Sequence, residues 1–578
     1  MKAKFLDILS KTGNKWVNLS FYAKWKLLLI TFCIMLIPGI ISLIKIFQDG
    51  LGMLPLNNSV VWGTFIVNFI FWIGIAHAGT FISAFLLLLR QNWRHEIHRF
   101  AESMTIIAIL VAALMPVFHL GKPLLFYKLF PFSDYTGLIL INFNSPIIWD
   151  FYAILTYLLV SFIFLGSDYL PEKMLIFKKK PSLETTQHKF NFLQFNLLSK
   201  NQYYLAILAT PLVISVHSIV SYDFAVSLRA GWHNSIFPVY FVVGAIMSGF
   251  AMIGLWLPFA AKHPSFKNLI SVKHLIPIKK IIIGCSVFLS FVFLNELLGI
   301  ANSSHKSEIW QLMSKLKSGS LVVYLISVSS TLILPHLLWK NKFKSVTSRL
   351  QWICLLILIG MWLERFVIVV GSSTSSELPA QFTTYSPNLI SLGLNSGIIA
   401  LFSVMFLLVI RYLPLISYHK SGSQNLINHE EEIILIFNSE NDFQNALSFL
   451  SESQIMLTIL PNENDILAKN KTAKFAFLSI LISFPLIVLL QYIVHKNHNL
   501  VLGEKPVFSI LSFIPVALVL SLLVAAIILF FSLLYKIREK TVLNDNNSSK
   551  YQISLKRENY LLVKAELSAF NSNLSKNN

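Results

Sequence analysis

The segment VWGTFIVNFIFWIGIAHAGTFISAFLLLL (residues 61–89) contains no Asp, Glu, Lys or Arg. A helix needs about 20 mostly apolar residues to cross the hydrocarbon core of a bilayer, so this segment predicts a transmembrane helix. The whole 578-residue chain has the same character, because 55% of its residues are hydrophobic and only 13% are charged. Soluble domains carry about 25% charged residues. The composition therefore excludes a disordered chain, a disulfide scaffold and an ordinary soluble enzyme, and it indicates a polytopic membrane protein.

Twelve segments have the length and polarity of spans: 27–47, 61–89, 100–120, 147–167, 203–227, 236–261, 281–300, 319–339, 350–371, 388–410, 474–495 and 508–535. Basic residues gather in cytoplasmic loops of membrane proteins. Alternate loops, counted from the N-terminus, hold 36 of the 47 Lys and Arg residues, whereas the other loops hold 8. The alternation predicts that both termini are cytoplasmic. The net charge of +20 is then explained by topology, and no binding to nucleic acid is expected.

The chain is predicted to have two parts. Residues 1–420 contain ten spans. Residues 421–578 contain the last two spans, 474–495 and 508–535, and a small cytoplasmic α/β module, formed by residues 429–470 with a possible addition from 550–570. Within the module the pattern predicts strands at 432–437 and 454–460, a helix at 439–452, and a further strand and helix after residue 550. The expected fold class is an all-α polytopic membrane protein that carries this module.

Ionisable groups collect at one predicted depth. Ionisable residues inside a membrane are costly and are candidates for function. From the predicted orientation, His119, Asp150 and Asp223 lie near the outer ends of three different spans, and His217 lies about 9 Å deeper on the same helix as Asp223. Arg229 and His233 follow in the next outer loop. Helix capping would explain Asp150 alone, but the shared depth favours a site.

The chemistry of these groups suits a hydroquinone. Oxidation of a hydroquinone releases two electrons and two protons, and histidine and carboxylate side chains can hold the ring hydroxyls and accept the protons. We therefore predict His119, Asp150 and Asp223 as catalytic groups. Other residues are predicted to bind the quinol: Trp149, His217, Phe224, Arg229 and His233. No metal site is expected.

A second polar set occurs on later spans and consists of Glu296, His336, Glu364 and Arg365. The adjacent residues Glu364 and Arg365 point to different sides of a helix, so each is expected to need its own partner. The set can form an ion-paired structural network or a proton path, and both interpretations stay open. In span two, His77 is expected to make an interhelical hydrogen bond.

Several long motifs resemble one family of membrane proteins. They are NFIFWIGIAHAGTFISAFLLLLRQNWRHEIHRFAESMTIIAILVAALMPVFHLGKP (68–123), SPIIWDFYAI (145–154) and PLVISVHSIVSYDFAVSLRAGWHNSIFPVYFVVGAIMSGFAM (211–252). They resemble the NrfD/polysulfide-reductase membrane-anchor family, and within it the ActC subunit of bacterial alternative complex III. The segment QYIVHKNHNLVLGEKPVFSILSFIPVALVL (491–520) resembles the ActD subunit. The chain thus resembles an ActC–ActD fusion.

The resemblance implies two four-helix bundles with flanking helices, in the bacterial inner membrane. It implies oxidation of menaquinol or ubiquinol at a pocket near the periplasmic face that includes His119, Asp150 and Asp223, with no haem or iron–sulfur cluster in this chain. The implied partners are c-type haem subunits together with an iron–sulfur/molybdopterin-like subunit, another NrfD-like subunit and a terminal oxidase. The chain would be part of an oxidoreductase and not catalytic alone.

Three alternatives stay open. A quinone-site anchor of a molybdenum reductase, such as polysulfide reductase, lies within the same family. A secondary transporter would show inverted repeats and broken helices at midplane, and no repeated motif is evident. A dihaem cytochrome b needs paired histidines at two depths, whereas only His77 and His217 lie well inside the first spans.

Overall fold

The computed structural model describes most of the helical part of the chain. The described residues are 20–57, 60, 63–121, 123–130, 143, 145–177, 184–227, 232, 234–263, 272–302, 309, 321–339, 346–374, 385–413, 415, 432–437, 445, 457–460, 471–496, 510–538, 551–556 and 572–575. The chain divides into two compact units. Unit 1 holds residues 1–161, 209–416 and 484–520, and unit 2 holds 162–208, 417–483 and 521–578.

Twelve helices in the described residues are long and apolar enough to cross a membrane, which confirms the predicted count. Nine of them are α2 (Phe21–Asp49), α5 (His98–His119), α6 (Pro146–Phe177), α7 (Glu184–Ala225), α8 (Phe237–Ala260), α9 (Val272–Asn302), α14 (Leu389–Tyr412), α18 (Lys471–Lys496) and α19 (Ile510–Arg538). The other three change helix type along their length and are α3–η2–α4 (Gly63–Thr80, Phe81–Phe85, Leu86–Leu88), α11–η5–η6 (Leu321–Val328, Ser329–Ile333, Leu334–Trp339) and α12–η8–α13 (Val346–Phe366, Val367–Gly371, Ser372–Thr374).

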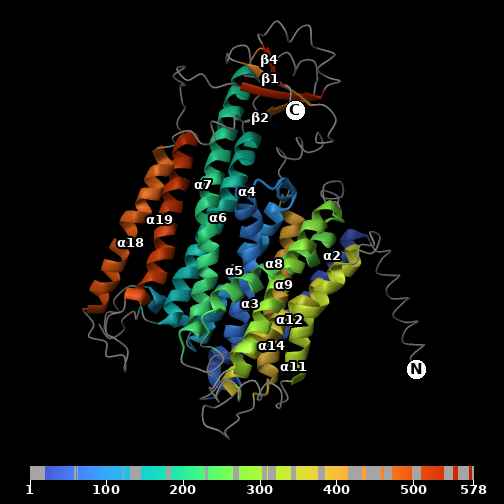
Figure 1. Ribbon diagram of the computed structural model, residues 1–578, viewed down its shortest axis with the longest axis vertical. Helices are drawn as coiled ribbons and strands as arrows, with labels where there is room; N and C mark the ends of the chain where they lie inside the picture. The colour runs from blue at the N-terminus through green and yellow to red at the C-terminus, as the bar shows by residue number, and fades with distance from the viewer. Residues whose placement is uncertain are drawn as a thin grey trace, which may run out of the picture. The chain divides into compact units, whose positions relative to one another are not determined.

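The helix contacts of unit 1 fall into two groups, one around α3 and one around α8, and both helices are labelled in Figure 1. In the first group, α3 packs on α5, receives a hydrogen bond from Tyr157 of α6 at the carbonyl of Ala76 (2.9 Å), and reaches the Val213 carbonyl of α7 through His77 (2.6 Å). In the second group, α8 packs on α9 and α12, and α12 packs on α11. Contact between α3 and α8 joins the groups, and α2 and α14 pack together beside them.

Glycines allow α2 and α14 to approach until their backbones touch. Gly393 and Gly397 of α14 form a GxxxG motif, which lets membrane helices pack closely. A Cβ atom on Gly39 of α2 would lie 2.4 Å from the Cα atom of Gly397, and a Cβ on Gly393 would lie 2.4 Å from the Oγ atom of Ser42. Most of the apolar surface of α2 is otherwise exposed, so this crossing is where the helix is held.

Three π-helical segments interrupt the spans, and each offers a carbonyl to a side chain from elsewhere. A backbone carbonyl has no water to bind inside a bilayer and must be paired within the protein. In η2, the Ser83 carbonyl accepts from Arg94 (3.0 Å). In η5, the Thr331 carbonyl accepts from Ser286 of α9 (3.0 Å), and in η8 the Ile368 carbonyl accepts from Trp232 (2.7 Å). These donors connect the irregular turns to neighbouring segments.

Unit 2 contains a four-stranded antiparallel sheet in the order β2-β3-β1-β4. The strands are β1 (Glu432–Phe437), β2 (Leu457–Leu460), β3 (Tyr551–Lys556) and β4 (Ser572–Ser575). Since β1 and β2 both run antiparallel to β3, which lies between them, they run in the same direction. The strands predicted at 432–437, at 454–460 and after residue 550 are therefore present. The short polar strand β4 was not predicted. The predicted helices at 439–452 and after the third strand fall outside the described residues, so the α/β interpretation and its cytoplasmic side stay predictions.

We expect Gly39→Ala to lower the free energy of unfolding by about 1–3 kcal/mol, because the added methyl group would force the α2 and α14 backbones apart. The measurement is thermal denaturation of the purified full-length protein in detergent. Gly284→Ala on α9 is the matched control, since nothing lies within 4 Å of its Cβ position. The control is expected to be neutral or slightly stabilising, by up to about 1 kcal/mol of helix propensity. Equal effects of the two substitutions would contradict the packing argument.

Candidate functional site

Asp150 and Asp223 lie at the same end of the first helix group with their carboxyl groups facing each other. Asp150 is one turn after the start of α6, and Asp223 is two residues before the end of α7. Their side chains are 4% and 6% exposed, and the two carboxyls lie within hydrogen-bonding reach of each other. A hydrogen bond between two carboxyl groups needs a proton on one of them. The pair can therefore hold and exchange a proton.

Each aspartate also has an unused acceptor. The Oδ1 atoms of Asp150 and Asp223 are buried and have no hydrogen-bond partner within the described part of the chain. Buried polar atoms are almost always paired, and each exception calls for an explanation. A ligand with hydroxyl groups would supply the missing donors.

Aromatic residues adjoin both aspartates in the chain. Trp149 precedes Asp150 and donates from its indole nitrogen to the carbonyl of Phe143 (2.6 Å). Phe224 follows Asp223, is completely buried, and lies edge-on to Trp232 at a ring-centroid distance of 4.9 Å. Phe241 of α8 lies 5.9 Å from Phe224. Phe224, Trp232 and Phe241 thus form an aromatic cluster next to Asp223 in the chain.

His217 lies deeper in the same helix group, beside His77. The two ring centroids are 4.5 Å apart, and both side chains are fully buried. His77 contacts the carbonyls of Ile73 (2.8 Å) and Val213 (2.6 Å), which confirms the expected interhelical contact. The ring of His217 is approached by the backbone of Phe241, without the geometry of a full hydrogen bond among the described residues.

His119 is the last residue of α5 and is not joined to the aspartates by any contact in the described residues. Its ring lies 6.3 Å from that of Phe65, and its Nδ1 atom is buried without a hydrogen-bond partner within the described ranges. The structure therefore brings together two of the three predicted catalytic groups. Arg229 and His233 lie outside the described residues.

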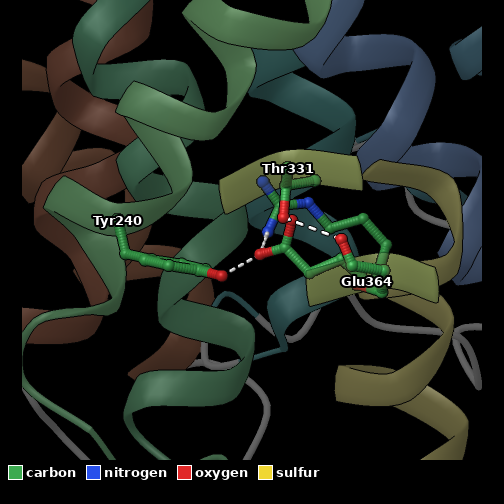
Figure 2. A network of polar contacts seen from close by, with 5 residues as sticks. Tyr240, Thr331 and Glu364 are labelled. Atoms are coloured by element: carbon green, nitrogen blue, oxygen red, sulfur yellow. Dashed lines mark hydrogen bonds and ion pairs between the residues drawn. The ribbon is translucent and has the colours of Figure 1, made fainter. Parts of the chain in front are cut away.

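The second polar set separates in the structure. Glu364 accepts a hydrogen bond from the Tyr240 hydroxyl of α8, which points at the carboxyl group in Figure 2. Arg365 lies 3.6 Å from the same Glu364 oxygen, so the two neighbours are in ion-pair contact. The expectation that each residue needs its own partner is thus only half right. Both residues do have a partner on another helix. Tyr240 donates to Glu364, and the guanidinium carbon of Arg365 lies 4.4 Å from the centre of the Phe241 ring. The adjacent residues nevertheless also meet each other.

The other two members of that set lie apart from Glu364. His336 accepts a hydrogen bond from the indole of Trp339 (3.0 Å), one turn further along η6. Glu296 lies partly exposed on α9, and no contact between it and Glu364 occurs in the described residues. A continuous path through all four residues is not visible in the structure.

Sequence reasoning missed Tyr240. The sequence held a weak signal for it. Tyr240 lies near the start of the predicted span 236–261, and Glu364 lies near the end of the predicted span 350–371, so the two residues are expected at a similar depth. Gly244 was also missed; a Cβ atom there would lie 2.5 Å from the Arg365 guanidinium and would force that group to shift. In the described residues, no group of three or more His, Cys, Asp and Glu side chains is arranged to hold a metal ion.

We expect Tyr240→Phe to lower the free energy of unfolding by about 1–3 kcal/mol, because the buried Glu364 carboxyl loses its donor. In a double-mutant cycle with Glu364→Met, we expect a coupling of about 0.5–3 kcal/mol. The measurement is chemical or thermal denaturation in detergent. Tyr127→Phe, at an exposed ring, is the control and should stay within about 0.5 kcal/mol of the parent. Strictly additive effects would show that the contact contributes nothing.

Comparison with known proteins agrees with this architecture. The family model described as "Polysulphide reductase, NrfD" matches residues 53–375, more than half of the chain. The C subunit of the selenate reductase of Mesobacillus selenatarsenatis is 22% identical over 67% of this chain and 94% of its own length. The C membrane subunit of a putative dimethyl sulfoxide reductase of Halobacterium salinarum is 21% identical over 64% of this chain and 86% of its own. The chain is therefore a multi-pass membrane protein that belongs to the polysulphide reductase NrfD family.

Proposed function

We propose that this chain is the quinol-binding membrane subunit of an oxidoreductase complex, and that the quinol binds at Asp150 and Asp223. The observation that carries the proposal is the buried carboxyl pair with one unpaired oxygen on each member, within the described residues. One hydroxyl of a quinol would donate to the aspartate pair, and the hydroxyl at the other end of the ring would face His119. The flat rings of Trp149 and Phe224 would border the ring of the quinol.

The proposed reaction converts the quinol to a quinone. The two O–H bonds break, two electrons leave to a redox group of a partner subunit, and two protons pass to side chains of this chain. The carboxyl pair accepts one proton in addition to the one that it shares. His119, with its unpaired Nδ1 atom at the same helix end, is the proposed acceptor of the second. The substrate class is menaquinol or ubiquinol.

We propose a structural role for the second polar set. Tyr240 donates to Glu364, and Arg365 lies in ion-pair contact with the same carboxyl group, so the two opposite charges balance without a ligand. The Glu364 Oε2 and Arg365 Nη1 atoms have no hydrogen-bond partner among the described residues. Glu296 and His336 lie away from them, and this separation favours pairing within the fold over a four-residue proton path.

Two candidates for the electron acceptor are each favoured by an observation. The relatives are named as subunits of selenate and dimethyl sulfoxide reductases, which favours an iron–sulfur and molybdenum reductase. The matches to the two relatives cover 67% and 64% of this chain, and residues 491–520 of the C-terminal part resemble the ActD subunit. That part favours an alternative complex III-like assembly, whose partners are c-type haem subunits together with an iron–sulfur subunit, another NrfD-like subunit and a terminal oxidase. In both cases we propose the bacterial inner membrane, with both termini cytoplasmic and the sheet of unit 2 in a cytoplasmic α/β docking module.

Asp223→Asn and Asp150→Asn are each expected to lower the rate of quinol-dependent reduction of the partner's redox groups by about 10²–10⁴-fold, because an amide cannot accept the proton. The measurement is stopped-flow absorbance of the purified, assembled complex mixed with a water-soluble quinol. Asp49→Asn, at the exposed end of α2, is the matched control and should keep the parental rate. If both site variants assembled normally and kept the parental rate, the assignment of the quinol site to these aspartates would be wrong.

Affinity purification of the intact complex from its native membrane should identify the acceptor. We expect c-type haem bands and no molybdenum by elemental analysis, because the extended C-terminal part resembles a component of the haem-containing assembly. Stoichiometric molybdenum without haem would instead select the reductase candidate. Both outcomes leave the quinol site to be tested by the aspartate variants.

A further inference from the structure

The ends of α2, α8 and α14 meet in a cluster of basic and aromatic side chains. The ring of Phe21 on α2 lies 5.2 Å from that of Phe259 near the end of α8. The indole of Trp25 donates to the carbonyl of Leu407 on α14 (2.8 Å). Loop charges predict that these three helix ends face the cytoplasm. The contacts bring together residues from three distant parts of the sequence.

Three cationic side chains and a histidine lie in this cluster. Lys24 comes from α2, Lys262 and His263 directly follow α8, and Arg411 lies in the last turn of α14. Neither Lys262 nor Arg411 forms an ion pair with a carboxylate in the described ranges. Like charges are therefore gathered where a membrane helix leaves the hydrocarbon.

The proximity of these groups affects their titration. Partial burial, followed by repulsion from Lys24, lowers the pKa of Lys262. Partial burial, followed by repulsion from Arg411, lowers the pKa of His263. Both directions show that a further positive charge is costly here, and that an anion bound between the groups would stabilise them.

Aromatic rings hold the cations in place. The guanidinium carbon of Arg411 lies 4.2 Å from the centre of the Trp25 ring and 5.6 Å from that of Tyr22. The ring of His263 lies 5.0 Å from that of Phe21. Trp and Tyr are enriched at the headgroup level of bilayers. Beyond them, α2 exposes an apolar stripe suited to acyl chains, formed by Leu27, Ile30 and Ile34.

We propose that this basic–aromatic cluster (Lys24, Lys262, His263 and Arg411 with Tyr22 and Trp25) binds the phosphate headgroup of an acidic phospholipid. Basic pockets between membrane helices on the cytoplasmic side recognise anionic headgroups. The acyl chains of the lipid lie along the apolar stripe of α2, which a free phosphate would not use. The proposal is independent of the quinol site, since none of its residues belongs to that site.

The test uses the delipidated full-length protein in a neutral detergent, titrated with phosphatidylglycerol and followed by thermal denaturation. We expect phosphatidylglycerol to raise the melting temperature, and phosphatidylcholine to have little effect. Lys262→Gln with Arg411→Gln should weaken the apparent affinity about 30-fold, from the attraction of two basic residues to an acidic surface. Lys262→Arg with Arg411→Lys should keep most of the affinity, because the charges remain.

The matched control is Lys280→Gln with Arg349→Gln, which removes two basic residues from the same predicted side on α9 and α12. This variant should bind phosphatidylglycerol as the parent does. Equal affinity in all variants would overturn the proposal, as would an equal loss in the charge-conserving and the neutral pairs. Full competition by inorganic phosphate at concentrations comparable with the lipid would also overturn it, since the ligand would then be free phosphate.

Discussion

The structure depends on one constraint, which is that a bilayer offers no hydrogen bonds to the polar groups placed inside it. Regular helices satisfy this constraint for their backbones, but three spans here contain π-helical segments. In each, a side chain from another part of the chain supplies a donor to a carbonyl: Arg94 to Ser83, Ser286 to Thr331 and Trp232 to Ile368. The same constraint explains why His77 contacts backbone carbonyls on two helices. The hydrogen bonds that pair these irregular backbone carbonyls therefore also connect neighbouring segments of unit 1.

Against that background, the groups that stay unsatisfied stand out. The Tyr240, Glu364 and Arg365 cluster is buried and places an acid next to a base, with opposite charges in ion-pair contact, although Glu364 Oε2 and Arg365 Nη1 have no hydrogen-bond partner in the described residues. The Asp150 and Asp223 pair consists of two acids, and each keeps an unpaired oxygen within the described chain. The charges of the first cluster balance each other, whereas two neighbouring acids need a proton between them. This difference is the physical reason for proposing the ligand at the aspartates and a structural role for the glutamate.

Much of this could be predicted from the sequence. Apolar length gave the twelve spans, and the alternation of loop charge placed Asp150 and Asp223 at one depth, where the structure has them facing each other. The prediction was less successful for His119. This residue ends α5 on the same side of the helix group as the aspartates, but it makes no contact with them in the described residues. The partner of Glu364 was missed, because a tyrosine in an apolar span resembles any other aromatic residue until the neighbouring helix is known.

The sequence by itself determined the membrane class and the number of spans, and it predicted the orientation and the depth of each ionisable group. These follow from composition and from distance along a single helix, both of which are local properties. Only the tertiary structure decided which helix faces which. It placed Tyr240 against Glu364, Gly39 against Gly397, and the basic ends of α2, α8 and α14 together. Such contacts join residues that are more than a hundred positions apart, and their choice depends on the packing of whole helix surfaces, which no short stretch of sequence contains.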